Sequence, residues 1–122
     1  MKRPFLICDD CRTWRCLIGV LLAPFGREII MAPDGMAVVR LARQRMPILA
    51  ILDLQMPGDI QGDAIARALR ETAPPTPVLL HSSADESELE EVANRIGCEW
   101  RCKAPGGIGL REHVQLLVEG KP

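Results

Sequence analysis

Short apolar runs alternate along the chain with longer segments in which apolar residues recur at helical spacing. The run at 48–52 is apolar throughout, which is typical of a strand that is covered on both faces of its sheet. In the last run, the apolar residues Trp100 and Cys102 alternate with charged ones. The pattern predicts five strands, at Phe5–Cys8, Arg27–Met31, Ile48–Leu52, Val78–His81 and Glu99–Cys102.

The segments between these runs have the apolar stripes of helices that pack on a core. Trp14 belongs to the first stripe, and we interpret every stripe as core-facing. Asp34 stands where its side chain can cap the second helix. We expect helices at Thr13–Leu22, from the Asp34 cap through Arg45, and at Gly62–Thr72, Asp85–Ile96 and Leu110–Val118. Strands and helices that alternate with short connections predict an α/β fold, with a doubly wound, mostly parallel sheet and helices on both faces.

Length and charge limit the classes of function. With 122 residues the chain is long enough for one domain with a real core, and we expect residues 1–122 to form a single unit. A net charge of −1 argues against a dedicated nucleic-acid binder, and no apolar run is long enough to span a bilayer. The cysteines are odd in number and nothing in the sequence indicates secretion, so we expect free thiols in a reducing, cytoplasmic compartment.

Acidic residues follow two of the predicted strands. Asp9 and Asp10 come directly after the first strand, and Asp53 ends the third. Sites in such sheets lie outside the carboxyl ends of the strands, so these acids form one cluster if the two strands are neighbours. Three close carboxylates repel one another unless a cation lies among them, and Mg²⁺ is a hard dication that prefers oxygen ligands. The alternative is that Asp9 and Asp10 only start a helix and Asp53 only starts a turn.

A hydroxyl group and an ammonium group are predicted at the same edge of the sheet. Ser82 and Ser83 end the fourth strand, and Lys103 ends the fifth. Each is ordinary alone, since Ser83 can cap the next helix and a lysine after a strand is usually solvated. Together with the acids they supply a nucleophilic carboxylate, a metal, a hydroxyl donor and a fixed cation. Those groups suit phosphoryl transfer onto a carboxylate, which mostly needs positioning and charge neutralisation.

On these residues, the chain resembles the receiver domain of bacterial two-component response regulators over nearly its whole length. The resemblance implies a five-stranded parallel sheet of order 2-1-3-4-5 with five helices. Any one of the matching pieces is weak, but the ordered set, each piece after its own strand, is specific. The pieces are Cys8-Asp9-Asp10, Asp53-Leu54-Gln55-Met56-Pro57-Gly58, Ser83-Ala84, and Lys103 with a proline nearby.

The resemblance also implies the chemistry of the site. Asp53 would accept a phosphoryl group from a histidine kinase or a phosphotransfer protein. Mg²⁺ would be held by the carboxylates of Asp9, Asp10 and Asp53 and by the backbone carbonyl of Gln55. The protein would be mainly a signalling domain, one that catalyses its own aspartyl phosphorylation and dephosphorylation.

Further residues have implied roles in switching. Ser83 would hydrogen-bond the phosphoryl group, and Lys103 would pair with it. Trp100 occupies the position of the family's aromatic switch residue, and Gln55 and Asp85 fall where the family tunes hydrolysis of the acyl phosphate. We expect phosphorylation to alter the face built from the fourth helix, fifth strand and fifth helix.

That face would bind a downstream protein that the sequence does not identify, and a homodimer is also open. We expect no direct nucleic-acid partner and no membrane partner. The alternative function is a degenerate receiver, which keeps the fold but acts as a phosphorylation-independent protein-interaction module.

Two residues depart from the family's pattern. The family usually has a proline directly after the lysine, but here Ala104 separates Lys103 from Pro105, and a cis bond before alanine costs about 2.5–4 kcal/mol. We therefore predict that the loop through Gly109 is atypical and mobile. The second departure is Trp100, whose bulk is expected to prevent the inward rotation that tyrosine makes and to leave the switch partly uncoupled.

Two cysteine-based alternatives are open. The CxxC motif at 8–11 lies between a strand and a helix, as in thioredoxin-like redox proteins, although the two acids inside it disfavour a thiolate. Cys98 and Cys102 could join this motif in a zinc site, but the first and fifth strands are not neighbours in the implied sheet order. We interpret His81 as a strand-end residue and His113 as a helix-surface residue rather than as ligands.

Overall fold

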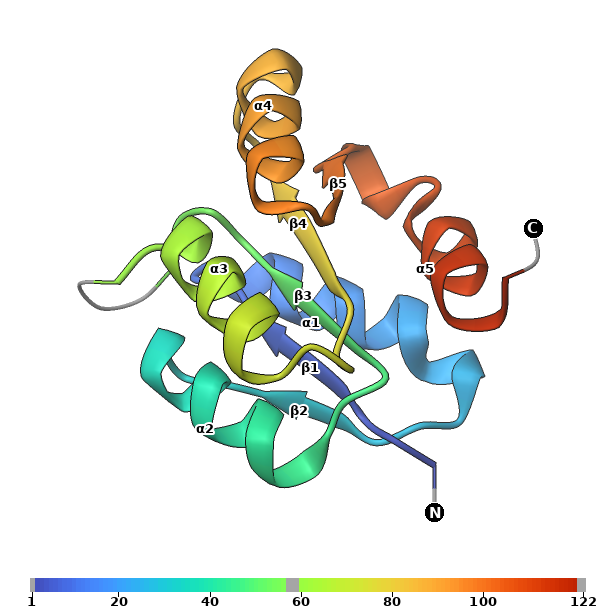
Figure 1. The fold of residues 1–122 in the computed structure, drawn as a ribbon. Coiled ribbons are helices and arrows are strands. Elements are labelled where there is room, and N and C mark those ends of the chain that lie inside the picture. Colours follow the sequence, from blue (N-terminus) through green and yellow to red (C-terminus); the bar gives the residue numbers. More distant parts are fainter. Residues whose placement is uncertain (1, 57–59, 121–122) are drawn as a thin grey trace.

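A computed structural model describes residues 2–56 and 60–120 (Figure 1). Strands and helices alternate in the order that the sequence predicted. No helix in these two ranges combines the length and the apolar character needed to cross a membrane. Pro57 and Gly58, which belong to the family resemblance, lie outside the described residues. The strands are β1 (Phe5–Cys8), β2 (Ile29–Met31), β3 (Leu49–Leu52), β4 (Val78–Ser82) and β5 (Glu99–Cys102). The helices are α1 (Arg12–Leu22), α2 (Gly35–Arg45), α3 (Gly62–Thr72), α4 (Glu86–Ile96) and α5 (Leu110–Glu119), with short 3-10 turns η1 (Ala23–Phe25) and η2 (Pro105–Gly107).

The five strands form one parallel sheet of order β2-β1-β3-β4-β5, which confirms the predicted fold class and strand order. β1 lies between β2 and β3, and Phe5 pairs with Ile29 on one side and Leu49 on the other. β4 pairs with β3, and β5 forms the far edge. Because all pairs are parallel, the carboxyl ends of the strands lie along one edge of the sheet, where the candidate site residues were expected.

Helices cover both faces of the sheet and enclose two cores (Figure 1). On one face, α1 and α5 pack against Phe5 and Ile7 of β1 and the equivalent residues of β3. On the other face, α2, α3 and α4 pack against Leu6 and Cys8 and their equivalents. Successive side chains of a strand point to opposite faces, so both faces of β1 and β3 are buried. That double burial explains why these two strands are apolar throughout.

Most observed boundaries lie within two residues of the predicted ones, and α3 has the predicted bounds. The side chain of Asp34 caps α2, where it accepts a hydrogen bond of 2.9 Å from the backbone N–H of Ala37. The predicted second strand was too long, because Arg27 precedes β2 and its guanidinium donates to the backbone oxygen of Arg3 at 2.9 Å. β4 is one residue longer than predicted and includes Ser82.

Candidate functional site

Three carboxylates meet at the carboxyl edge of the sheet. Asp9 and Asp10 follow β1 and Asp53 follows β3, and these strands are neighbours whose register pairs Cys8 with Leu52. One carboxylate oxygen from each acid lies within 4.8 Å of the others. Asp9 and Asp53 are 3% and 4% exposed, whereas Asp10 is exposed. The sheet therefore brings together the three acids that the sequence singled out, with Asp10 on the solvent side.

Local hydrogen bonds orient the two buried carboxylates. Oδ1 of Asp9 accepts a hydrogen bond of 2.9 Å from the backbone N–H of Cys11. Oδ1 of Asp53 accepts one of 3.2 Å from the backbone N–H of Gln55. Aspartate makes such turns readily because its short side chain reaches the backbone two residues further along. Each buried acid thus has one oxygen fixed by the backbone and a second oxygen available for other partners.

Lys103 places a positive charge between those second oxygens. Its ammonium nitrogen lies 2.7 Å from Oδ2 of Asp53 and 2.9 Å from Oδ2 of Asp9, and its side chain is 6% exposed. The backbone N–H of Lys103 donates to the carbonyl oxygen of Ser82 at 2.8 Å, which continues the pairing of β4 with β5. Burial by itself would lower the pKa of Lys103, but the hydrogen bonds to Asp53 and Asp9 outweigh it and raise the pKa. The lysine is therefore charged at neutral pH.

The donor set fits a hard divalent cation. Counted at their formal charges, three carboxylates and one ammonium group leave an excess of two negative charges in the cluster. Carboxylates this close repel one another without a counter-ion, and Mg²⁺ coordinates carboxylate oxygens while it keeps several waters. Among residues 2–56 and 60–120, these acids are the group of acidic, histidine or cysteine side chains that comes close enough together to hold a metal ion.

A hollow of about 230 Å³ adjoins the segment that follows Asp53. The hydroxyl oxygen of buried Ser82 accepts a hydrogen bond of 3.2 Å from the backbone N–H of Ala84, whereas Ser83 is exposed. The Ser83 side chain does not cap α4, whose N-cap residue is Asp85, so that alternative was wrong. Ser83 instead belongs to the lining of the hollow. The lining residues are Leu54, Gln55, Ser82, Ser83, Ala84 and Glu88.

Sequence reasoning missed a tryptophan beside Lys103 and the histidine that packs against that tryptophan. Trp14, on α1, has its ring centroid 5.5 Å from the ammonium nitrogen of Lys103. The same indole ring meets the ring of His81 edge-on, with the centroids 5.0 Å apart and the ring planes at 83°. His81 lies inside β4, is 1% exposed, and has no hydrogen-bond partner for Nδ1. The helical spacing of Trp14 indicated only the core, and His81 was interpreted only as a strand-end residue, so neither pattern pointed to this contact.

We expect the free energy of unfolding to decrease as the pH falls from 6.5 to 4, because buried His81 resists protonation. Burial lowers the pKa of His81 from 6.5 to about 4, and the positive charge of Lys103 acts in the same direction. In this range the unfolded chain binds a proton that the folded chain does not, and stability is lost. The full loss is roughly 3 kcal/mol, since one pKa unit corresponds to about 1.36 kcal/mol.

Urea unfolding at pH 7 and pH 5 measures this effect. His81→Leu should lose about 2 kcal/mol less than the wild type between these two pH values. Every other side chain is the same in both proteins, so the difference between their losses isolates position 81. Equal losses would mean that folded His81 is protonated as readily as unfolded His81.

The cysteine-based alternatives do not fit the structure. Burial, followed by the negative charges of Asp34 and Asp9, raises the pKa of the Cys8 thiol to about 12. Cys8 is therefore a protonated thiol rather than the reactive thiolate of a CxxC redox site. The zinc site would have to join cysteines next to β1 with cysteines next to β5, but two strands separate β1 from β5. Among the described residues, no cysteine belongs to the group of side chains that could hold a metal ion.

The loop that follows β5 turns through η2 before α5 begins. The described peptide bonds are all trans, including the one before Ala104. Gly107 has a φ of 70°, and a Cβ at this position would lie 2.5 Å from Cδ1 of Leu21, so the loop packs closely on α1. The mobility of the loop stays a prediction. The same is true of the uncoupled switch at Trp100, which is half-buried in β5.

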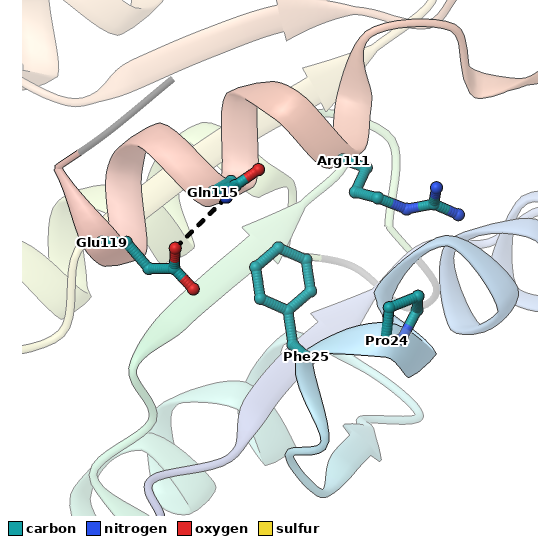
Figure 2. Close-up of a pocket in the computed structure, with 5 residues that line it drawn as sticks. All are labelled: Pro24, Phe25, Arg111, Gln115 and Glu119. Carbon is teal, nitrogen blue, oxygen red and sulfur yellow. Dashed lines mark hydrogen bonds between the residues drawn. The ribbon is translucent and has the colours of Figure 1, made fainter.

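A second hollow, of about 210 Å³, lies between η1 and α5 (Figure 2). Figure 2 shows Gln115 directed toward Glu119, to which its amide donates a hydrogen bond of 3.3 Å. The ring of Phe25 packs edge-on against Phe5, at the amino end of β1, with centroids 5.4 Å apart. This hollow is therefore at the opposite end of the strands from the acids. Its lining residues are Pro24, Phe25, Arg111, Gln115 and Glu119.

Comparison with known proteins gives one family. A sequence model of the response regulator receiver domain matches residues 5–99. The solved receiver domain of Francisella response regulator 1452 has a TM-score of 0.83 and 22% identity, with 98% of each chain covered. The chemotaxis protein CheY4 of Vibrio cholerae has a TM-score of 0.80 and 23% identity, with 96% of this chain and 99% of that chain covered. These two structures share the fold of the chain.

Two proteins of known sequence are similar to parts of this chain. Protein PilH of Pseudomonas aeruginosa is 31% identical over 83 residues, which cover 66% of this chain and 68% of PilH. The transcriptional regulator ycf27 of Galdieria sulphuraria is 29% identical over 87 residues, which cover 71% of this chain and 34% of the regulator. The match thus spans about a third of the length of ycf27. With the matched family model, the sheet order and the clustered acids in agreement, the chain belongs to the receiver domains of two-component response regulators.

Proposed function

We propose that this receiver domain, residues 1–122, is a phosphoacceptor switch in which Asp53 takes a phosphoryl group from a histidine kinase or a histidine phosphotransfer protein. The proposal rests on the charged groups that surround Asp53. Its buried carboxylate lies 2.7 Å from the ammonium group of Lys103 and close to two further carboxylates that suit a dication. A carboxylate in such a setting is a nucleophile whose new negative charge is neutralised by groups already in place.

The transfer mostly needs positioning and charge neutralisation. A carboxylate oxygen of Asp53 attacks the phosphorus of the donor phosphohistidine. The new P–O bond forms as the P–N bond breaks, and the imidazole leaves with its electron pair and takes a proton from solvent. Lys103 pairs with one phosphoryl oxygen, and the hydroxyl group of Ser83, in the lining of the hollow, donates a hydrogen bond to another. Bound Mg²⁺ would supply positive charge to the phosphoryl oxygens.

The proposed Mg²⁺ ligands are the carboxylates of Asp9, Asp10 and Asp53 and the backbone carbonyl of Gln55. Mg²⁺ is expected to raise the melting temperature by several degrees, because it binds the folded chain and relieves repulsion among the acids. Asp10→Asn removes a charged ligand from the exposed side of the cluster and should weaken Mg²⁺ binding by about tenfold or more. Calorimetric titration of both proteins measures the difference, and wild-type protein that melts at the same temperature with and without Mg²⁺ would contradict the metal site.

The test of phosphorylation uses acetyl phosphate as a small donor. After incubation with Mg²⁺, we expect mass spectrometry to find one phosphoryl group per chain, on the peptide that contains Asp53. Hydroxylamine should release it, because acyl phosphates react with that nucleophile, and EDTA should prevent its formation. A phosphoryl group on Ser83, or none at all under conditions where Mg²⁺ binds, would refute the proposal.

The second candidate function is a phosphorylation-independent protein-interaction module. Ala104, at the position where the family usually has proline, is the feature that favours it. In either case we propose that the face of α4, β5 and α5 binds a downstream protein or a second copy of the chain. Binding through this face that is the same with and without acetyl phosphate would select the module over the switch.

A further inference from the structure

Trp14 lies against the ammonium group in the acidic cluster. It is in the first turn of α1, and its ring centroid is 5.5 Å from Nζ of Lys103. The same nitrogen lies 2.7 Å from Asp53 and 2.9 Å from Asp9. We propose that Trp14 is a positioning residue that holds the ammonium group of Lys103 against the two carboxylates, and so places it for the incoming phosphoryl group.

The physical reason is the flexibility of lysine. A lysine side chain is a compact charge on a flexible four-carbon stem, so the two ion pairs alone leave its path to the cluster loosely defined. The face of an indole ring attracts a cation within about 6 Å of the ring centroid. In this site the ring adds a third contact to the ammonium group and covers a lysine side chain that is 6% exposed. Leucine at position 14 would fill space but provide no comparable attraction.

His81 holds the indole ring in place. The two rings meet edge-on at 83° with centroids 5.0 Å apart, which is a preferred geometry for aromatic pairs. His81 belongs to β4, which lies between the strands that precede Asp53 and Lys103. Its buried Nδ1 has no hydrogen-bond partner, and an unpaired buried polar atom is destabilising. An apolar side chain at position 81 would avoid the cost of this unpaired nitrogen. A role in supporting Trp14 explains why the position holds a histidine instead.

The inference rests on the proposed function, because it assigns a residue to the same site. Trp14 contacts the lysine and is not one of the three acids, so its loss should affect the rate of phosphoryl transfer rather than the affinity for Mg²⁺. A variant that simply damages the fold would impair both. The ratio of these two effects therefore separates positioning from a general structural role.

The test compares Trp14→Leu with Trp14→Phe, both in a Trp100→Phe background, with acetyl phosphate as the donor. We expect the rate constant for labelling to fall about threefold to tenfold in the leucine variant. The phenylalanine variant keeps an aromatic face and should lose less than about twofold. The Mg²⁺ concentration that gives half the maximal rate should change by less than about twofold in both. Equal rates in the leucine variant and its parent, or a parallel loss of Mg²⁺ affinity, would overturn the proposal.

Fluorescence gives a readout that does not need phosphorylation. The chain has two tryptophans, so Trp14 is the single emitter in the Trp100→Phe background. Lys103→Gln removes the charge from the indole face and should change the emission, whereas Lys2→Gln, near Gly26, should not. Unchanged emission in the Lys103→Gln variant would overturn the contact. If the parent takes up no phosphoryl group, the proposed function fails, and the emission comparison alone then decides whether Trp14 holds Lys103.

Discussion

Replacing Asp53 by asparagine is expected to abolish phosphoryl labelling while the domain stays folded. An amide oxygen is a far weaker nucleophile than a carboxylate, so uptake from acetyl phosphate should fall by at least about a hundredfold. Asparagine has nearly the same size and can still accept the hydrogen bond that the backbone N–H of Gln55 donates at 3.2 Å. The turn after β3 should therefore persist in the variant.

The same substitution should leave stability without metal unchanged or slightly higher. The excess negative charge of the cluster falls from two to one, so the repulsion of Asp53 by Asp9 and Asp10 disappears. The loss of the 2.7 Å ion pair with Lys103 acts against this gain, but the lysine keeps its contact with Asp9. In Mg²⁺ the variant should be less stable than the wild type. It is expected to bind the ion more weakly, so binding raises its free energy of unfolding by less.

Urea unfolding with EDTA and with saturating Mg²⁺, beside the labelling assay, tests both statements. Asp63→Asn is the matched control, because Asp63 lies on α3 outside the acidic group. It should keep full labelling and the wild-type response to Mg²⁺. An Asp53→Asn protein that is labelled as well as the control would remove Asp53 as the acceptor. Unfolding of the variant in EDTA would show that the carboxylate is instead a structural requirement.

The position of the acids was predictable because it depends on backbone direction alone. Residues directly after parallel strands lie at one edge of the sheet, so the strand pattern alone assigns Asp9 and Asp53 to that edge. The order of the strands is a different matter. Apolar periodicity identifies a strand but carries no information on its neighbours, and the adjacency of β1 and β3 came from the resemblance.

The contacts of Lys103 could not be read from the sequence with the same detail. β4 separates β5 from β3, and β3 and β4 separate it from β1, so the lysine must reach past one strand to meet Asp53 and past two to meet Asp9. That reach depends on side-chain rotamers rather than on element order. The contact of Trp14 with Lys103 and His81 could not be predicted for another reason. Trp14 fits the apolar stripe of its helix and His81 fits the end of its strand, so neither residue stands out in the sequence. An apolar residue that lies beside a charged group contributes to the hydrophobic periodicity of its helix in the same way as one that only fills the core.

Replacing Gly62 by alanine is expected to destabilise the domain by about 3 kcal/mol or more, because the added Cβ would clash with backbone atoms. A Cβ at this first residue of α3 would lie 2.0 Å from the carbonyl oxygen of Asp53 and 2.9 Å from Cα of Leu54. Neither neighbour is a flexible side chain that could turn away. The backbone N–H of Gly62 also donates to the carbonyl oxygen of Leu54 at 2.9 Å, so the close approach is part of how α3 joins the end of β3.

Because relief of the clash must move either α3 or the segment that carries Asp53, the folded fraction of Gly62→Ala should also label more slowly than the wild type. Gly19→Ala is the matched control. Gly19 lies in the middle of α1, and a Cβ there meets nothing within 4 Å. The control should be more stable than the wild type by about 0.5–1 kcal/mol, because alanine favours a helix over glycine. Urea midpoints that move equally in the two variants would mean that the approach of α3 to Asp53 is looser than these distances imply.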